Sequence, residues 1–292
     1  MQKFFRNRNL LAVVLVAASL SACGGSDDSP SVATSSTSST PATTSPSVAV
    51  PESSAQVACR PNGSFTYSGS ASQVTPSNGT LAVVVVPTLP ADAQKNRNFT
   101  APAAPASSQV QQASGAFTTL ASSGAATDCL GLDHGTVSDI QGVGSDVAIG
   151  RWNAAMDTDG NTYNSTQGVH YAVGTPLSLT ATGGTLACTQ LIADTVANND
   201  GGTAGTLGTT SATLDLGTRT LNDLSMSINV AGTNYTLTNT QAPLNGTSAT
   251  GQLSIQSVVV GHDATQPLVA LGYSATLPNT QAIGGVVVLS CK

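Results

Sequence analysis

Residues 212–240 read ATLDLGTRTLNDLSMSINVAGTNYTLTNT, and apolar side chains alternate with polar ones along three runs of this stretch. The apolar positions are Ala212, Leu214 and Leu216 in the first run, Leu224, Met226, Ile228 and Val230 in the second, and Tyr235 and Leu237 in the third. Alternation with period two is typical of strands with one buried and one solvated face, and short glycine-containing turns join antiparallel neighbours. The stretch therefore predicts an antiparallel meander whose apolar face is covered or curls into a barrel.

The second half of the chain continues this pattern. Strand candidates lie at residues 146–153, 168–174, 185–192, 206–216, 221–230, 235–240, 251–261, 268–277 and 283–291. Eight or nine evenly spaced strands favour an up-and-down barrel over a sandwich, closed by pairing of the last strand with the first. Five Tyr, five Phe and one Trp are too few for the aromatic girdles of a transmembrane barrel, so the apolar side chains are expected to fill the barrel interior.

The first half predicts a smaller β-rich portion over residues 56–135, with strands at 64–68, 81–86 and 116–120. The unbroken β-branched run at 83–86 indicates a strand buried on both faces. Residues 87–112 are rich in Pro, Ala, Gln and Ser and predict a long loop, with weak helical character near 107–113. The predicted fold class is all-β, with an eight-stranded antiparallel barrel at 140–292 after this small portion.

The N-terminus carries export signals. Lys3, Arg6 and Arg8 precede a nine-residue apolar segment that is too short to span a bilayer permanently. Leu20-Ser21-Ala22-Cys23 then matches the lipobox of bacterial lipoproteins, which implies a signal peptide at 1–22 and acyl chains such as palmitate on Cys23. In the Gram-negative sorting rule that the lipobox resemblance implies, aspartate after the lipidated cysteine retains a lipoprotein at the inner membrane, so Gly24 favours the outer membrane. The alternative is an ordinary secretory signal that happens to contain Cys.

Residues 23–55 consist mainly of Ser, Thr, Pro and Ala and offer almost nothing to bury. Such a segment cannot offset its ordering entropy, so it predicts a disordered tether between the lipid and the folded part. An O-glycosylated stalk is the alternative interpretation.

The charge balance restricts the partners. Only 8% of the residues are charged, and without the leader the chain has six basic residues against fifteen acidic ones, a net charge of −9. Nucleic acids and anionic membranes bind proteins through basic surface patches, which an acidic chain lacks. We therefore expect neither of them to be recognised through charge. The predicted contact with a membrane is made through the N-terminal lipid.

Four cysteines remain if Cys23 is lipidated, namely Cys59, Cys129, Cys188 and Cys291. An even number in an exported protein predicts two disulfides, and four cysteines allow three pairings. We favour 59–129 and 188–291, one in each portion. A metal site is the alternative, but the sequence has no CxxC spacing.

Metal and catalytic signals are weak. Asp157, Asp159 and Asn161 resemble the start of a calcium loop, yet Thr162 and Gly168 stand where such a loop needs Gly and an acid, so we favour a hairpin turn. The three histidines are isolated, with no HxH or HExxH spacing, although His170 is expected to be packed or hydrogen-bonded within its strand. No nucleophile, phosphate-loop or dinucleotide motif occurs. We expect a protein that is not an enzyme and needs no cofactor, with Trp152 as a core anchor of the barrel.

Four segments together resemble a known barrel module. They are Ile149-Gly150-Arg151-Trp152, the run Gly168-Val169-His170-Tyr171-Ala172-Val173-Gly174-Thr175-Pro176, the hairpins of 212–240 and the closing strand at 285–289. They resemble the eight-stranded C-terminal barrel of the transferrin-binding protein B-like surface lipoproteins, a barrel also attached to some FecR-type proteins. The resemblance covers about half the chain and includes no match to the lobes that contact transferrin.

Two functions follow from this resemblance as expectations. The first is a lipid-anchored binding module at the outer membrane or cell surface, for a host protein, a haem- or iron-related ligand, or an envelope partner. The second is a structural or accessory lipoprotein that faces the periplasm and binds no small ligand.

Overall fold

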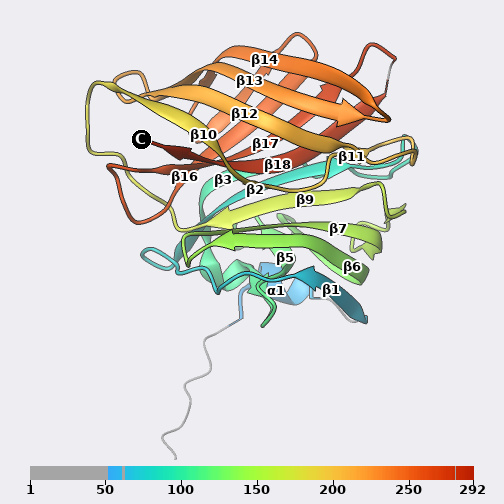
Figure 1. The fold of residues 1–292 in the computed structure, drawn as a ribbon. Coiled ribbons are helices and arrows are strands. Elements are labelled where there is room, and N and C mark those ends of the chain that lie inside the picture. The colour runs from blue at the N-terminus through green and yellow to red at the C-terminus, as the bar shows by residue number, and fades with distance from the viewer. Residues whose placement is uncertain (1–51, 61–62, 280) are drawn as a thin grey trace, which may run out of the picture. The chain divides into compact units, whose positions relative to one another are not determined.

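The computed structural model describes residues 52–60, 63–279 and 281–292 (Figure 1). All of them belong to one compact unit that extends from Ala49 to Lys292. The signal peptide, Cys23 and the tether up to residue 51 lie outside the described residues. No helix in the described part is long and apolar enough to cross a membrane.

The first of two sheets is built from the N-terminal half of the described chain. Its strands are β1 (Phe65–Gly69), β2 (Thr80–Thr88), β3 (Phe99–Pro105), β4 (Val110–Gln111), β5 (Phe117–Ala121), β6 (Cys129–Val143), β7 (Val147–Asp157), β8 (Thr162–Tyr163) and β9 (Gly168–Gly174). They pair in the order β3-β2-β9-β7-β6-β5-β4, with β8 beside β7 and β1 parallel to β6. The short helix α1 (Ser54–Ala58) precedes this sheet, and a 3-10 turn, η1 (Ala106–Ser108), follows β3.

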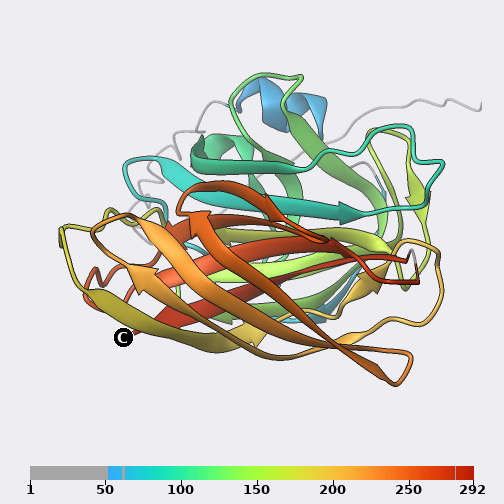
Figure 2. The ribbon, with the colours of Figure 1, turned by 90° about the horizontal axis from the view of Figure 1, so that it is seen from above.

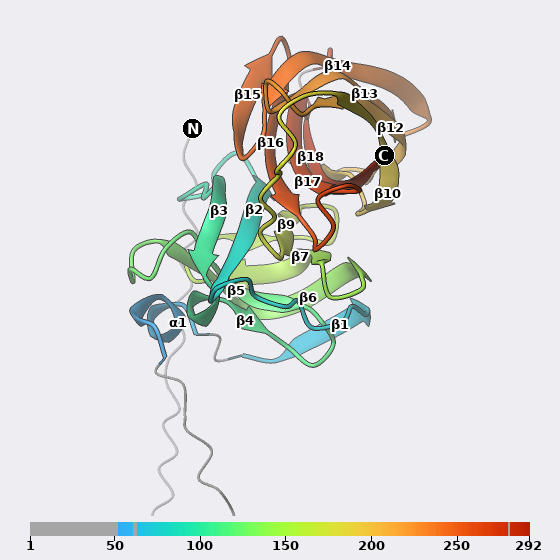
Figure 3. The same cartoon turned by 90° about the vertical axis from the view of Figure 1, so that its left-hand side faces the viewer.

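The second sheet forms an eight-stranded, nearly closed barrel. Its strands are β10 (Thr185–Ala193), β11 (Ala197–Asn198), β12 (Thr206–Asp215), β13 (Thr220–Val230), β14 (Thr233–Pro243), β15 (Gly246–Thr250), β16 (Leu253–Val260), β17 (Leu268–Thr276) and β18 (Ala282–Cys291). They pair in the order β14-β13-β12-β10-β18-β17-β16-β15, with the short β11 added to β18. Figure 3 looks along this barrel, and Figure 2 shows β12, β13 and β14 side by side. The all-β prediction and the up-and-down barrel are confirmed.

The last strand of the barrel, β18, pairs with β10, from Cys188↔Cys291 onward. The strand expected to be first in the barrel, at residues 146–153, lies in β7 of the other sheet, so closure is made by β10 instead. The remaining seam lies between β14 and β15, which have no backbone ladder between them. Side chains bridge it instead: Asn239 Nδ2 donates to Ser248 Oγ over 3.3 Å and to Thr250 Oγ1 over 3.1 Å.

Three apolar layers hold the fold together. The alternating residues of β13, including Leu224, Met226 and Ile228, point into the barrel interior and are fully buried. A second layer, with Val84 and Val286, lies between the barrel and the first sheet. A third layer, with Val83 and Trp152, lies on the other face of the first sheet. Because β2 lies between the second and third layers, it is buried on both faces, as its β-branched run predicts.

Figure 1 shows β2 beside β17 and β18, and glycines let the two sheets approach closely there. A Cβ on Gly272 of β17 would lie 2.5 Å from Val86 Cγ2 and 2.6 Å from Val84 Cγ1. Side chains at this position would push β2 away from the barrel, so glycine is required by packing and not by a turn.

The structure corrects the expected division of the chain. Strands β7 and β9, which were predicted to belong to the barrel, pair with β6 and β2 in the first sheet. The boundary expected near residue 140 therefore falls inside the first sheet, and the barrel begins at β10. Trp152 is fully buried as expected, but it packs in the first sheet, where its Nε1 donates to Phe117 O over 2.7 Å. Periodicity shows that a strand is buried but does not show which sheet it joins.

Two further expectations are wrong in detail. Residues 87–112 contain β3 and β4 and are not one long loop. The tether was expected to reach residue 55, but Ser53 caps α1 by accepting a hydrogen bond from Gln56 N, and Ala55 packs against the Cys59–Cys129 disulfide. Because Ala55 is fully buried in this contact, residues 53–55 belong to the folded part.

Candidate binding groove

A groove of about 490 Å³ lies between the loop that joins β2 to β3 and one end of the barrel. The barrel side consists of the ends of β16, β17 and β18. The lining residues are Pro87, Thr88, Leu89, Pro90, Ala91, Ala93, Asn96, Asn98, Asn199, Gln252, Ser254, Ser274, Ala275, Thr276, Ala282 and Ile283. No charged residue and no His, Cys, Met or aromatic residue is among them.

The two walls differ in chemistry. The barrel wall presents hydroxyl and amide groups from Gln252, Ser254, Ser274 and Thr276, whereas the loop wall begins with a mostly apolar run at residues 87–91. The side chains of the four barrel residues make no hydrogen bond to any residue of the described part. The groove therefore offers unused donors and acceptors on one side and apolar surface on the other.

Asn98 is held in place at the junction of the two sheets. Gln256 of β16 is buried, and its Nε2 donates to Val85 O over 2.8 Å and to Asn98 Oδ1 over 2.5 Å. Gln256 Oε1 accepts from Thr100 Oγ1 over 2.5 Å. The Gln256 side-chain amide thus makes hydrogen bonds to β2, to β3 and to the loop at the same time. These bonds fix the orientation of Asn98.

Asn199, which directly follows β11, is fixed against the start of β18. Its backbone N donates to Ala282 O over 2.9 Å, and its Oδ1 accepts from Ala282 N over 3.0 Å. Gln167 Nε2 donates to Asn199 O over 2.7 Å. These bonds leave the Asn199 amide nitrogen without a partner in the described part of the chain.

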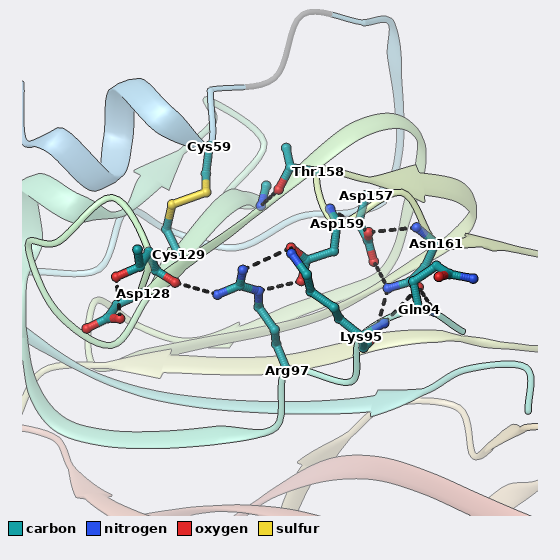
Figure 4. Close-up of polar contacts among 12 residues, drawn as sticks. Cys59, Gln94, Lys95, Arg97, Asp128, Cys129, Asp157, Thr158, Asp159 and Asn161 are labelled. Atoms are coloured by element: carbon teal, nitrogen blue, oxygen red, sulfur yellow. Dashed lines mark hydrogen bonds and ion pairs between the residues drawn. A yellow bond between two sulfur atoms is a disulfide. The ribbon is translucent and has the colours of Figure 1, made fainter. Parts of the chain in front are cut away.

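An ion-pair cluster braces the outer side of the loop (Figure 4). The Asp159 side chain is only 5% exposed; its carboxylate pairs with Arg97 through Nε and through Nη2 at 2.9 Å, and with Lys95 Nζ at 3.2 Å. Arg97 Nη1 also donates to Thr127 O over 2.6 Å. Burial alone would raise the pKa of Asp159, but the hydrogen bonds and charges of Arg97 and Lys95 lower it below the usual value.

Asp157 and Asn161 complete this brace as a turn (Figure 4). Asp157 Oδ1 accepts from Asp159 N at 3.0 Å and Asn161 N at 3.1 Å, and Asp157 Oδ2 accepts from Asn161 Nδ2 at 3.1 Å. Asn161 Oδ1 accepts from Gln94 N at 2.8 Å, and Asn161 Nδ2 donates to Lys95 O at 2.9 Å. Burial raises the pKa of Asp157, although the bonds from Asn161 oppose the rise.

The three calcium candidates therefore use their side-chain oxygens on protein donors. This arrangement agrees with the turn and not with a calcium loop, whose oxygens face an ion. Among the described residues, no group of three or more His, Cys, Asp or Glu is placed to hold a metal ion. The turn positions the loop wall of the groove.

Both disulfides are present in the pairing that the sequence analysis favoured. Cys59–Cys129 ties α1 to the start of β6, next to the 122–128 loop that receives Arg97 (Figure 4). Cys188–Cys291 crosses the β10–β18 pair that closes the barrel.

Each histidine pairs with a carboxylate: His134 with its sequence neighbour Asp133, and His170 and His262 with aspartates distant in the sequence. His170 and Asp194 are buried together between the sheets, with 2.5 Å from Nδ1 to Oδ2, whereas the pairs His134–Asp133 and His262–Asp146 are partly exposed. Sequence reasoning missed the groove itself because its residues come from four distant segments. A local signal existed only in the amide-rich stretch around Asn96 and Asn98.

Comparison with known proteins adds little to this geometry. Neither a protein-family model nor a curated protein sequence matches the chain. Among solved structures, the chain is similar to the vaccine antigen transferrin binding protein B of Haemophilus parasuis. That similarity has a TM-score of 0.32 and 9% identity, and it covers 73% of this chain and 45% of the other. The chain thus spans less than half the length of that structure, and neither a family nor a ligand follows from so low a TM-score.

Proposed function

We propose that this protein is a lipid-anchored lipoprotein of the bacterial outer membrane that acts as a binding module at the cell surface. The observation that carries the proposal is the groove, where four side chains of the barrel wall have unused hydrogen-bonding groups beside a braced loop. A rigid, open site of this kind suits recognition of a partner, because little ordering is needed on binding.

Export is supported by three independent features. The leader with its lipobox at Cys23 predicts processing and lipidation. Both pairs of cysteines form disulfides, which persist in oxidising compartments and are rare in the cytosol. The low charge content fits a chain that relies on Thr, Ser and Asn for its polar surface.

The groove also narrows the partner classes expected from the sequence. Haem iron is held by His, Cys, Met or Tyr side chains, and none of these lines the groove. The groove therefore lacks the side chains that could coordinate haem iron, which disfavours a haem-related ligand there. A partner that presents uncharged polar groups fits it better.

The test is accessibility on intact Gram-negative cells that produce the full-length chain. Antibodies against the folded part, and an added protease, should reach the protein without permeabilisation, while a periplasmic marker stays protected. A Cys23→Ala variant should lose acyl labelling and leave the membrane fraction. Full protection of the wild-type chain until the outer membrane is opened would reject surface binding and favour the accessory, periplasm-facing role.

A further inference from the structure

We propose that the groove binds an uncharged carbohydrate, a neutral oligosaccharide whose hydroxyl groups face the barrel wall. This inference rests on the proposed binding function and names the chemical class of its ligand. It comes from the composition of the two walls and from the backbone pairing around them.

The barrel wall matches the chemistry of sugar hydroxyls. The hydroxyls of Ser254, Ser274 and Thr276 and the amide of Gln252 can each donate and accept a hydrogen bond, as every sugar hydroxyl can. All four lack partners in the described part of the protein. A ligand bearing neighbouring hydroxyls can therefore use this wall without displacing any internal hydrogen bond.

Thr88 lines the groove but does not add to its hydrogen-bonding groups. This lining residue is only 4% exposed, and its Oγ1 is buried with no hydrogen-bond partner in the described structure. Unsatisfied buried polar groups are rare because each loses its hydration without compensation. The Thr88 hydroxyl lies against Gly284 of β18, where a Cβ would approach it within 2.2 Å, so it is enclosed between the sheets and is not reached from the groove.

The opposite wall suits the apolar face of a sugar ring. Pro90, Ala91 and Ala93 offer accessible aliphatic surface. Leu89 and Ile283 are only 7% and 1% exposed and support the groove from beneath. Ligand sites commonly combine such surface with a few convergent polar groups. Their volumes are about 300–1,000 Å³, and the volume of this groove falls within that range.

Charged ligands and peptides fit less well. Anionic sugars and nucleotides need a cation, usually Arg or Lys, and the lining has none. A peptide strand needs a free sheet edge, but Ser254 pairs with both Ala249 and Ser274, and Ser274 also pairs with Gly284. The backbone of the barrel wall is thus already used, and only its side chains are available.

Recognition is preorganised by residues outside the groove. Gln256 orients Asn98, and the Asp159 cluster holds the loop through Arg97. A ligand would meet a loop wall that is already fixed, which reduces the entropy lost on binding.

The experiment measures binding to the mature full-length protein in detergent by calorimetry and by ligand-observed NMR. The probes are neutral tetrasaccharides of glucan, mannan and galactan type, a sialylated trisaccharide, and an uncharged Ser/Thr-rich pentapeptide. At least one neutral tetrasaccharide should bind, and the sialylated sugar and the peptide should not. Gln252→Glu, Ser274→Ala and Thr276→Val should each weaken binding by about tenfold, the effect of one lost hydrogen bond.

Thr236→Val is the matched control, because Thr236 is an exposed threonine on β14 that does not line the groove. It should bind the sugar like the wild-type protein, and all variants should keep the wild-type melting temperature. The inference is overturned if no neutral sugar binds, if only the peptide binds, or if the groove variants bind as tightly as Thr236→Val. Surface accessibility is measured without any ligand, so its failure and that of the sugar inference are distinguishable.

Discussion

His170 on β9 and Asp194, which follows β10, join the first sheet to the barrel through a hydrogen bond of 2.5 Å between Nδ1 and Oδ2. Both side chains are fully buried. Asp194 Oδ1 also accepts from Val286 N on β18 over 2.8 Å, so one carboxylate connects β9 of the first sheet to β18 of the barrel. Burial raises the pKa of Asp194, and the charge and hydrogen bond of His170 oppose that rise.

Removing the charge of this pair should destabilise the fold strongly. Asp194→Asn leaves His170 buried without its carboxylate, and we expect a loss of about 3 kcal/mol in the free energy of unfolding. Asp133→Asn is the control, because the Asp133–His134 pair has side chains 34% and 53% exposed and should contribute less than about 1 kcal/mol. Chemical denaturation measures both; equal losses would show that the buried pair contributes no more than the exposed one.

The Asp159 cluster should make stability depend on acid pH. The pKa of Asp159 is lower in the folded protein than the value of about 3.9 expected for the unfolded chain. Its stabilisation is therefore fully present above about pH 4 and is lost as pH falls through the folded pKa. Asp159→Asn should cost about 2 kcal/mol at pH 7, since Arg97 and Lys95 lose a charged acceptor. The difference in the free energy of unfolding between variant and wild type, measured by urea denaturation, should shrink below pH 4. A difference that stays constant with pH would contradict this account.

The Cys188–Cys291 disulfide should hold the barrel closed. Its cysteines are 103 residues apart, so reduction frees a long loop in the unfolded chain. Replacing both by serine should lower stability by about 2–5 kcal/mol. Amides of β10 and β18 should then exchange faster with deuterium than those of the first sheet. Uniform acceleration in both sheets would argue against a local role in closure.

Gly272 should be intolerant of even one methyl group. Gly272→Ala places a Cβ against Val84 and Val86 between the sheets, and such overpacking costs about 1–3 kcal/mol. Gly183→Ala is the matched control, because nothing lies within 4 Å of a Cβ there. Thermal unfolding of the two variants should separate them clearly, and similar melting temperatures would show that β2 can move away from the barrel.

Much of the barrel was predictable because apolar and polar residues alternate along its strands. One face of β13 meets the barrel interior and the other meets water, so its pattern in the sequence directly reports its environment. The strand at residues 168–174 was also found with its correct bounds, as β9. The 15-residue β6 was missed, because glycines at 131, 135 and 142 and shifts in its pairing with β7 interrupt the alternation.

From the sequence alone, local patterns determined the all-β class, the positions of most barrel strands and a favoured disulfide pairing. Only the tertiary structure decided that β7 and β9 belong to the first sheet and that residues near 88, 199, 252 and 276 share one groove. The physical reason is that burial along a strand depends on its own side chains. A groove depends instead on which distant segments are brought together when sheets pack and a barrel closes.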